Sequence, residues 1–204
     1  MTSRLRPILT ALALCLCTFS CNVVKEIHQA ITNLSRCKFK LVNISDFTLA
    51  GISLAGRSGF TLMEGATLAS AFAGDALPAS FTINVAAINP NDGTSGSTKS
   101  TATLTSFAWT LLIDNTTTIS GDIASPVTIP GTGQTTTIPL RMSLDLVKFF
   151  RDKGYTGVIN LALALGGANS SPGRLTLRAK PTISTDFGPI SYPREIDIVD
   201  KEFR

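Results

Sequence analysis

The stretch FTINVAA, residues 81–87, decides the fold class, because apolar side chains occupy every second position in it. In an extended chain Phe81, Ile83 and Val85 point to one face, while the polar Thr82 points to the other. This alternation is typical of a strand that buries one face and exposes the other to water. The period of two therefore predicts a sheet with a solvated side.

The same period recurs along most of the chain and predicts a mainly β protein. It is seen again at Phe107 to Ile113 and at Ile138 to Leu144. Asp114-Asn115 tolerates positive φ, so residues 105–113 and 116–124 are predicted to form a hairpin. Strands are expected over residues 38–54, 80–89, 101–113, 116–124, 134–144, 157–166, 173–184 and 190–203. Many short strands separated by turn residues favour an antiparallel β-sandwich rather than a parallel sheet.

Two short helices interrupt the strands, and a third precedes them. Leu62 to Ala73 is rich in Ala and ends at Gly74, and residues 145–153 end at Gly154, which suits a left-handed C-terminal cap. Between Val23 and Leu34 the apolar residues recur at intervals of three and four, which predicts a short amphipathic helix. That helix could dock on the domain or lie near a membrane.

The first 20 residues have the layout of a signal peptide. Two arginines precede an apolar run from Ile8 to Phe19. As a helix this run is about 18 Å long, too short for about 30 Å of hydrocarbon, so cleavage is favoured over a permanent span. Thr18-Phe19-Ser20-Cys21 resembles the lipobox of bacterial lipoproteins, which implies acylation of Cys21. Ordinary cleavage and an uncleaved signal are the alternatives.

The four cysteines do not form a disulfide framework. Cys15 and Cys17 lie inside the apolar run and would leave with it. If Cys21 is acylated, Cys37 has no partner. We expect Cys37 to be a buried, inert thiol at the start of a strand, with a redox role as the alternative.

Composition argues against a nucleic-acid partner. The chain of 204 residues is 44% hydrophobic and 16% charged, which suits a globular domain with a core. Its net charge of +4 comes from scattered residues, with part of the excess in the N-terminal segment. No basic patch of the kind that binds phosphates is evident.

Several short motifs follow the stretch that begins at Phe81: Asn89-Pro90-Asn91, then Gly121, Pro130 and Pro139. Their order resembles that of a known family, the type-2 late embryogenesis abundant domain. This domain is also called WHy, for water stress and hypersensitive response. The resemblance covers roughly residues 78–145, and the chain as a whole is similar to small bacterial lipoproteins of that family. The motif positions are Asn89, Pro90, Asn91, Gly121, Pro130 and Pro139. Taken alone, Asn-Pro-Asn is turn chemistry, so we expect these residues to be structural.

The resemblance implies a fibronectin-III or immunoglobulin-like β-sandwich. It also implies an association with desiccation and stress protection, and no enzymatic activity. We therefore expect a non-enzymatic, membrane-anchored lipoprotein that acts by binding a protein, lipid or glycan partner. An alternative is a lipid- or polysaccharide-binding accessory module for envelope transport or assembly.

A carboxylate-dependent hydrolase is a weaker alternative. The only histidine, His28, lies in the N-terminal helix outside the strands, which disfavours a Ser-His-Asp triad. One His and one remaining Cys cannot supply a usual zinc site, and no cofactor motif is present. Asp122, Asp145 and Asp186 are expected at strand ends and caps. Trp109 is expected in the core, with a ligand platform as the alternative.

These observations divide the chain into three parts. Residues 1–20 form the expected signal peptide, and residues 21–36 the lipidated start and short helix. Residues 37–204 form the expected β-sandwich domain. Acyl chains on Cys21 would anchor the protein in the cell envelope. Asn22, the residue after the acylated cysteine, favours sorting to the outer membrane, facing the periplasm.

Overall fold

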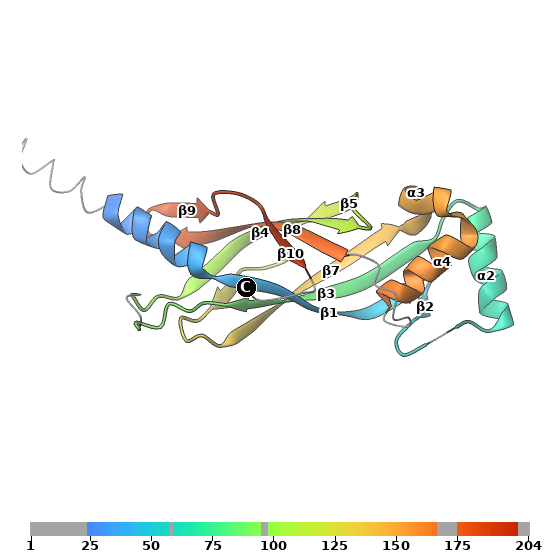
Figure 1. Cartoon of the computed structure of the whole chain (residues 1–204), viewed down its shortest axis with the longest axis horizontal. Coiled ribbons are helices and arrows are strands. Elements are labelled where there is room, and N and C mark those ends of the chain that lie inside the picture. Colours follow the sequence, from blue (N-terminus) through green and yellow to red (C-terminus); the bar gives the residue numbers. More distant parts are fainter. Residues whose placement is uncertain (1–23, 58, 95–97, 167–174, 200–204) are drawn as a thin grey trace, which may run out of the picture.

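A computed structural model of the chain describes residues 24–57, 59–94, 98–166 and 175–199. Two antiparallel sheets run along a long body, with helices gathered at one end and the N-terminal helix (residues 24–36) at the other (Figure 1). The mainly β prediction is thus confirmed. None of the described helices combines the length and the apolar character that crossing a membrane requires.

The first sheet has four strands in the order β2-β1-β3-β7. Its strands are β1 (Lys38–Leu49), β2 (Ile52–Ser53), β3 (Pro78–Ile88) and β7 (Thr135–Asp145). The stretch 81–87 lies in β3, the central strand, where Phe81, Ile83 and Val85 are buried as the alternation predicts. The single strand expected over 38–54 is instead a hairpin, because the chain turns at Ala50 and Gly51 with positive φ.

The second sheet has six strands around the paired β4 and β8. Its strands are β4 (Ala102–Ile113), β5 (Thr116–Gly121), β6 (Val127–Ile129), β8 (Leu175–Thr185), β9 (Gly188–Ser191) and β10 (Ile196–Val199). Strands β5 and β6 share one edge of β4, while β9 and β10 share the outer edge of β8. The hairpin turn at Asp114-Asn115 has φ of 48° and 64°, as predicted. The strand expected over 190–203 is broken into β9 and β10, and residues 200–204 lie outside the described part.

The two sheets enclose one hydrophobic core. Phe39 of β1 meets Phe107 of β4 across the layers, with ring centroids 5.3 Å apart. Within the first sheet, Phe47 stacks on Phe81 at 5.2 Å. Trp109 is 6% exposed, so the prediction that it packs in the core is confirmed. Aromatic pairs of this kind add about 0.5–1.5 kcal/mol beyond the area that they bury.

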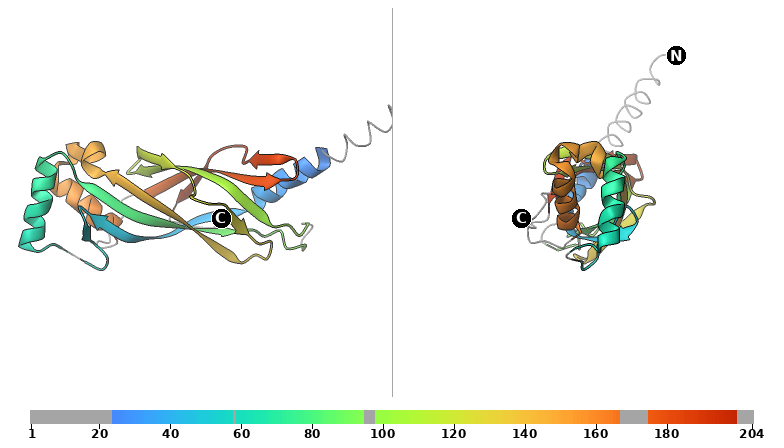
Figure 2. Two further views of the ribbon diagram at one scale, coloured as in Figure 1. Left: turned by 180° about the vertical axis from the view of Figure 1, so that it is seen from behind. Right: turned by 90° about the vertical axis from the view of Figure 1, so that its right-hand side faces the viewer.

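Helices α2 (Leu62–Ala73), α3 (Leu146–Phe150) and α4 (Gly154–Leu165) cover one end of the body, and the end view in Figure 2 shows α2 and α4 side by side. The prediction for 62–73 is confirmed. The helix expected over 145–153 is shorter, because it becomes the 3₁₀ turn η1 (Arg151–Lys153) before Gly154, whose φ is 68°. Asp145 caps α3 by accepting from Val147 N at 3.0 Å.

The strand expected over 157–166 is wrong, since these residues form most of α4. The run Leu161-Ala162-Leu163-Ala164-Leu165 alternates large and small side chains, but nearly all of them are buried. A continuous apolar run does not distinguish a buried strand from a buried helix, and both Leu and Ala favour helix. Packing decides the matter, because Tyr155 contacts Phe72 of α2 edge to face at 5.6 Å and donates to Gly65 O at 3.2 Å.

Candidate functional site

The motif Asn89-Pro90-Asn91 follows β3 directly and holds together the loops at one end of the sheets. Asn89 is fully buried. Its side-chain amide donates to Ser100 O at 2.8 Å and to Ile129 O at 3.1 Å. Its side-chain oxygen accepts from Asn91 N at 3.1 Å and from Asn91 Nδ2 at 2.7 Å. Every hydrogen-bonding position of this amide is therefore used within the protein.

Asn91 links this motif to the N-terminal helix. It is 1% exposed, and its Nδ2 also donates to Asn33 O at 2.9 Å. Asn33 in turn donates to Ser100 Oγ at 3.0 Å, and Leu34 is 1% exposed. The helix therefore docks on the domain through its C-terminal half. Its first residues project away, and Val24 is 63% exposed.

At this end of the fold the backbone at Gly131 packs closely against the backbone of Asn91 and Ser100. A Cβ atom on Gly131 would lie 2.3 Å from both Asn91 O and Ser100 O, so no other residue fits there without moving the backbone. Gly133 N donates to Asn89 O at 3.0 Å. The sequence analysis missed Gly131, although its place directly after Pro130 in the motif was a signal that could have found it.

The other motif positions lie apart from this cluster. Pro139 is in β7, an edge strand, where a residue without an N–H is tolerated. Gly121 ends β5 beneath the Trp109 ring, and a Cβ there would lie 2.5 Å from Cζ2. Pro130 follows β6, and its carbonyl accepts from Thr132 N at 2.9 Å. Cys21 lies outside the described residues.

A cavity of 320 Å³ lies between the N-terminal helix, the loop that follows Asn91 and the β8–β9 hairpin. The hairpin and the helix lie side by side in both long views (Figures 1 and 2). The wall of the cavity is formed by residues in or next to these three elements, which are Glu26, Ala30, Asn33, Leu34, Asn91, Ser100, Thr101, Ala102, Ile183, Ser184, Thr185, Asp186 and Phe187. The wall therefore combines carboxylates, amides and hydroxyls with one exposed aromatic ring.

A second, open groove of 530 Å³ lies between the start of β1 and β10. Phe39, Tyr192 and Ile198 give it apolar walls, and Arg36 and Lys38 stand beside it. Cys37 also lines this groove and is 6% exposed, which confirms the prediction of a buried thiol. Burial raises the pKa of Cys37 to about 11 and keeps it protonated and unreactive at neutral pH.

Asp122 is bound tightly at the end of β5. Burial raises the pKa of its carboxyl, but hydrogen bonds outweigh this effect and the pKa lies below its ordinary value. The donors are Ser106 Oγ at 2.6 Å, Phe107 N at 2.5 Å and Ile123 N at 2.7 Å. Three donors on one carboxylate indicate a structural clamp rather than a proton-transfer group.

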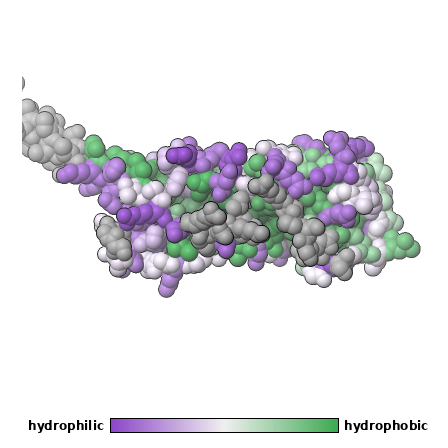
Figure 3. Space-filling view, viewed as in Figure 1, coloured by the Kyte–Doolittle hydropathy of each residue, from purple (hydrophilic) through white to green (hydrophobic). Residues whose placement is uncertain are grey.

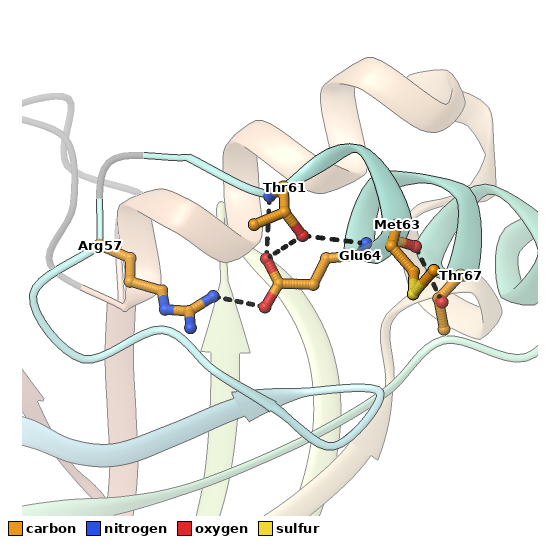
Figure 4. A network of polar contacts seen from close by, with 5 residues as sticks. All are labelled: Arg57, Thr61, Met63, Glu64 and Thr67. Carbon is orange, nitrogen blue, oxygen red and sulfur yellow. Dashed lines mark hydrogen bonds and ion pairs between the residues drawn. The ribbon is translucent and has the colours of Figure 1, made fainter.

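At the opposite end of the body, α2 begins with a capping box (Figure 4). Thr61 N donates to Glu64 Oε2 at 2.9 Å, and Glu64 N donates to Thr61 Oγ1 at 3.3 Å. The hydrogen bond from Thr61 N and the pairing with Arg57 lower the pKa of Glu64 to about 2. Just beyond the cap, Leu62 and Met63 are 93% and 82% exposed, and hydrophobic residues colour this end in Figure 3.

Within the described ranges, no group of three or more His, Cys, Asp and Glu side chains gathers as a metal site would require. His28 is exposed on the N-terminal helix. Glu26 and Asp186 are two carboxylates on the wall of one cavity, and both are exposed.

Comparison with known proteins names no family. No protein-family model matches the chain, and no curated protein matches it. Among solved structures, the chain is similar to a protein from Archaeoglobus fulgidus, at 15% identity and a TM-score of 0.34, covering 79% of this chain and 100% of that one. It is also similar to the putative ApaA protein from Bordetella pertussis, at 10% identity and a TM-score of 0.32, covering 78% and 95%.

Proposed function

We propose that this protein is a non-enzymatic lipoprotein, anchored through acyl chains on Cys21, with a binding or protective role in stress and desiccation. The observation that carries the proposal is the place of the N-terminal helix. That helix docks at one end of a long body through Leu34 and Asn33, and its first turn projects beyond the domain. An anchor before it would tether the body by its end.

Chain length sets the distance between such an anchor and the domain. Cys21 precedes residue 24 by three residues, and an extended chain spans at most about 3.6 Å per residue. The acylated residue would thus lie within about 11 Å of the helix, with α2, α3 and α4 directed away from the membrane. Two or three acyl chains make such anchoring stable, whereas one chain alone anchors only marginally.

The finer fold and family belong to this proposal. We place the two facing sheets in the fibronectin-III or immunoglobulin-like class and the chain in the type-2 late embryogenesis abundant family, in a bacterial lipoprotein form. The motif residues Asn89 and Asn91 support it, because both are buried and their side-chain NH₂ groups donate hydrogen bonds within the protein, as expected of structural residues. By this proposal the protein acts through its surface on a protein, lipid or glycan partner, in the outer membrane facing the periplasm.

Acylation is tested by labelling cells with a radioactive fatty acid. The wild-type protein should carry label and fractionate with membranes, and Cys21→Ser should lose the label and be released or left unprocessed. Cys37→Ser is the matched control, because it makes the same change at a buried thiol. An unlabelled wild type, or label that survives in Cys21→Ser, would overturn the anchoring. A deletion strain that dries and recovers as well as its parent would remove the stress role.

The groove between β1 and β10 favours a second candidate, a lipid-binding accessory module. It offers 530 Å³, within the range of about 300–1,000 Å³ usual for ligand sites. Apolar Phe39 and Ile198 line it, and cationic Arg36 and Lys38 stand beside it. Native mass spectrometry of protein extracted from membranes would distinguish the candidates. Bound lipid in addition to the covalent acyl chains supports the second, and its absence supports the first.

A further inference from the structure

We infer that the cavity between the N-terminal helix and the β8–β9 hairpin binds a saccharide or other polyhydroxylated ligand. This inference deepens the proposed binding role and names the ligand class. It rests on three independent features of the cavity wall: a buried amide oxygen without a partner, a set of uncommitted polar side chains, and an exposed aromatic ring held at the rim.

The first feature is the side-chain oxygen of Asn91. It is buried and has no hydrogen-bond partner within the described part of the chain. Exchanging the amide nitrogen and oxygen would not help, because Nδ2 already donates to Asn33 O and Asn89 Oδ1 and both bonds would be lost. A buried acceptor that lacks a donor destabilises the fold, because its hydration is lost and not replaced. Because the oxygen itself is buried, a donor from a ligand in the adjoining cavity would reach it, and recover part of the lost stability, only with a small shift of the cavity wall.

The second feature is the mixture of donors and acceptors on the wall. The carboxylates of Glu26 and Asp186 can accept hydrogen bonds, and the hydroxyls of Thr101 and Ser184 can also donate them. Within the described residues none of these four side chains makes a hydrogen bond or ion pair. An ammonium ligand could only donate to such a wall. A hydroxyl both donates and accepts, so a ligand with several hydroxyls matches the whole set.

The third feature is Phe187, which is 47% exposed. It is one of the two residues, with Asp186, that connect β8 to β9. Thr185 fixes this turn, because Phe187 N donates to Thr185 Oγ1 at 3.2 Å and Thr185 Oγ1 donates to Gly188 O at 2.7 Å. The ring is therefore presented at the rim by a rigid turn. The aliphatic face of a sugar ring can pack on such a surface while its hydroxyls reach the polar wall.

The cavity volume suits a small ligand of this class. At 320 Å³ it lies at the lower end of the range of about 300–1,000 Å³ for ligand sites. One or two sugar units would occupy it, either free in solution or as the head group of a glycolipid. Because the cavity borders the N-terminal helix, a glycolipid in the anchoring membrane would be within reach if Cys21 is acylated.

Saturation-transfer NMR on the full-length protein, in a detergent without a sugar head group, tests the inference with maltose as the probe. Maltose protons should receive saturation from the protein. Phe187→Ala should weaken binding about tenfold or more, and Asp186→Asn should weaken it severalfold. Both positions are exposed in a turn, so both variants should fold. Asp152→Asn makes the same change at the opposite end of the body and should bind like the wild type.

A parallel arm uses phosphatidylcholine vesicles with and without a galactosyl diacylglycerol. Binding of the glycolipid vesicles alone, lost in Phe187→Ala, supports the inference and assigns the source of the sugar. No binding in either arm, equal binding by Phe187→Ala, or binding of spermidine in place of maltose would each overturn it. An unacylated protein that binds maltose refutes only the anchoring, whereas an acylated one that fails to bind refutes only this inference.

Discussion

Replacing Asn89 by Ala tests whether the motif holds this end of the fold together. The substitution deletes two donors and one shared acceptor. Ser100 O and Ile129 O lose a side-chain donor, while Asn91 N and Asn91 Nδ2 lose their common acceptor. Asn89 is fully buried, so water does not readily replace these four hydrogen bonds.

The expected loss follows from the number of bonds. Each contributes about 1 kcal/mol net, and groups left buried without partners add to the cost, so Asn89→Ala should lower the free energy of unfolding by about 3–5 kcal/mol. That is a large share of the roughly 5–15 kcal/mol typical of domains. With a slope of about 2 kcal/mol per molar, the urea midpoint should fall by about 2 M.

Urea unfolding followed by the fluorescence of Trp109, the only tryptophan, measures this loss. Asn84→Ala is the matched control in the same segment. Asn84 Nδ2 bonds Asn43 Oδ1 at 2.8 Å and Ser45 Oγ at 3.2 Å at a partly exposed face of the sheet. Water can replace these hydrogen bonds, so Asn84→Ala should lower the free energy of unfolding by less than about 1 kcal/mol. If both variants lose the same stability, the reasoning about Asn89 is refuted.

Three further predictions concern other parts of the fold. Gly121→Ala should lower the free energy of unfolding by about 1–3 kcal/mol, because its Cβ would lie 2.5 Å from the Trp109 ring. Gly65→Ala places its Cβ in open space on α2 and should raise the free energy of unfolding by up to about 1 kcal/mol. Equal urea midpoints for the two variants would contradict this prediction. The raised pKa of Cys37 predicts that the free energy of unfolding falls as pH rises from 9.0 toward about 11, by about 2–3 kcal/mol more than in Cys37→Ala. Urea midpoints of the two proteins, measured across this pH range, test the prediction. The lowered pKa of Glu64 predicts that the Glu64 carboxylate contributes to the free energy of unfolding above pH 4.5 and that this contribution is lost as pH falls toward about 2. The difference in stability between the wild type and Glu64→Gln should therefore shrink in acid. A difference that does not change with pH would argue against a stabilising role of the carboxylate at the cap.

Local patterns in the sequence were sufficient for most of the secondary structure. The period of two predicted the strands around Phe81, Trp109 and Leu140, and positive-φ residues predicted the hairpin at Asp114-Asn115. The Ala-rich run and its Gly74 predicted α2. These features depend on neighbouring residues alone, because strand periodicity, turn conformation and helix capping act over a few positions.

Tertiary packing decided what local pattern left open. The apolar run after Gly157 suits a strand or a helix, and only contact with α2 through Tyr155 decides for a helix. By its local sequence Asn89 is a turn residue, yet its side chain binds Ser100, in the loop before β4, and Ile129, at the end of β6.

The candidate cavity likewise belongs to the tertiary structure. Asn91 and Phe187 come together there with residues of the N-terminal helix, although they are far apart in the sequence. By itself the sequence determined that the chain would alternate buried and exposed faces, because that depends on side-chain spacing along one strand. Which polar groups would meet was decided only when the sheets closed, because that depends on long-range contacts that no local pattern encodes.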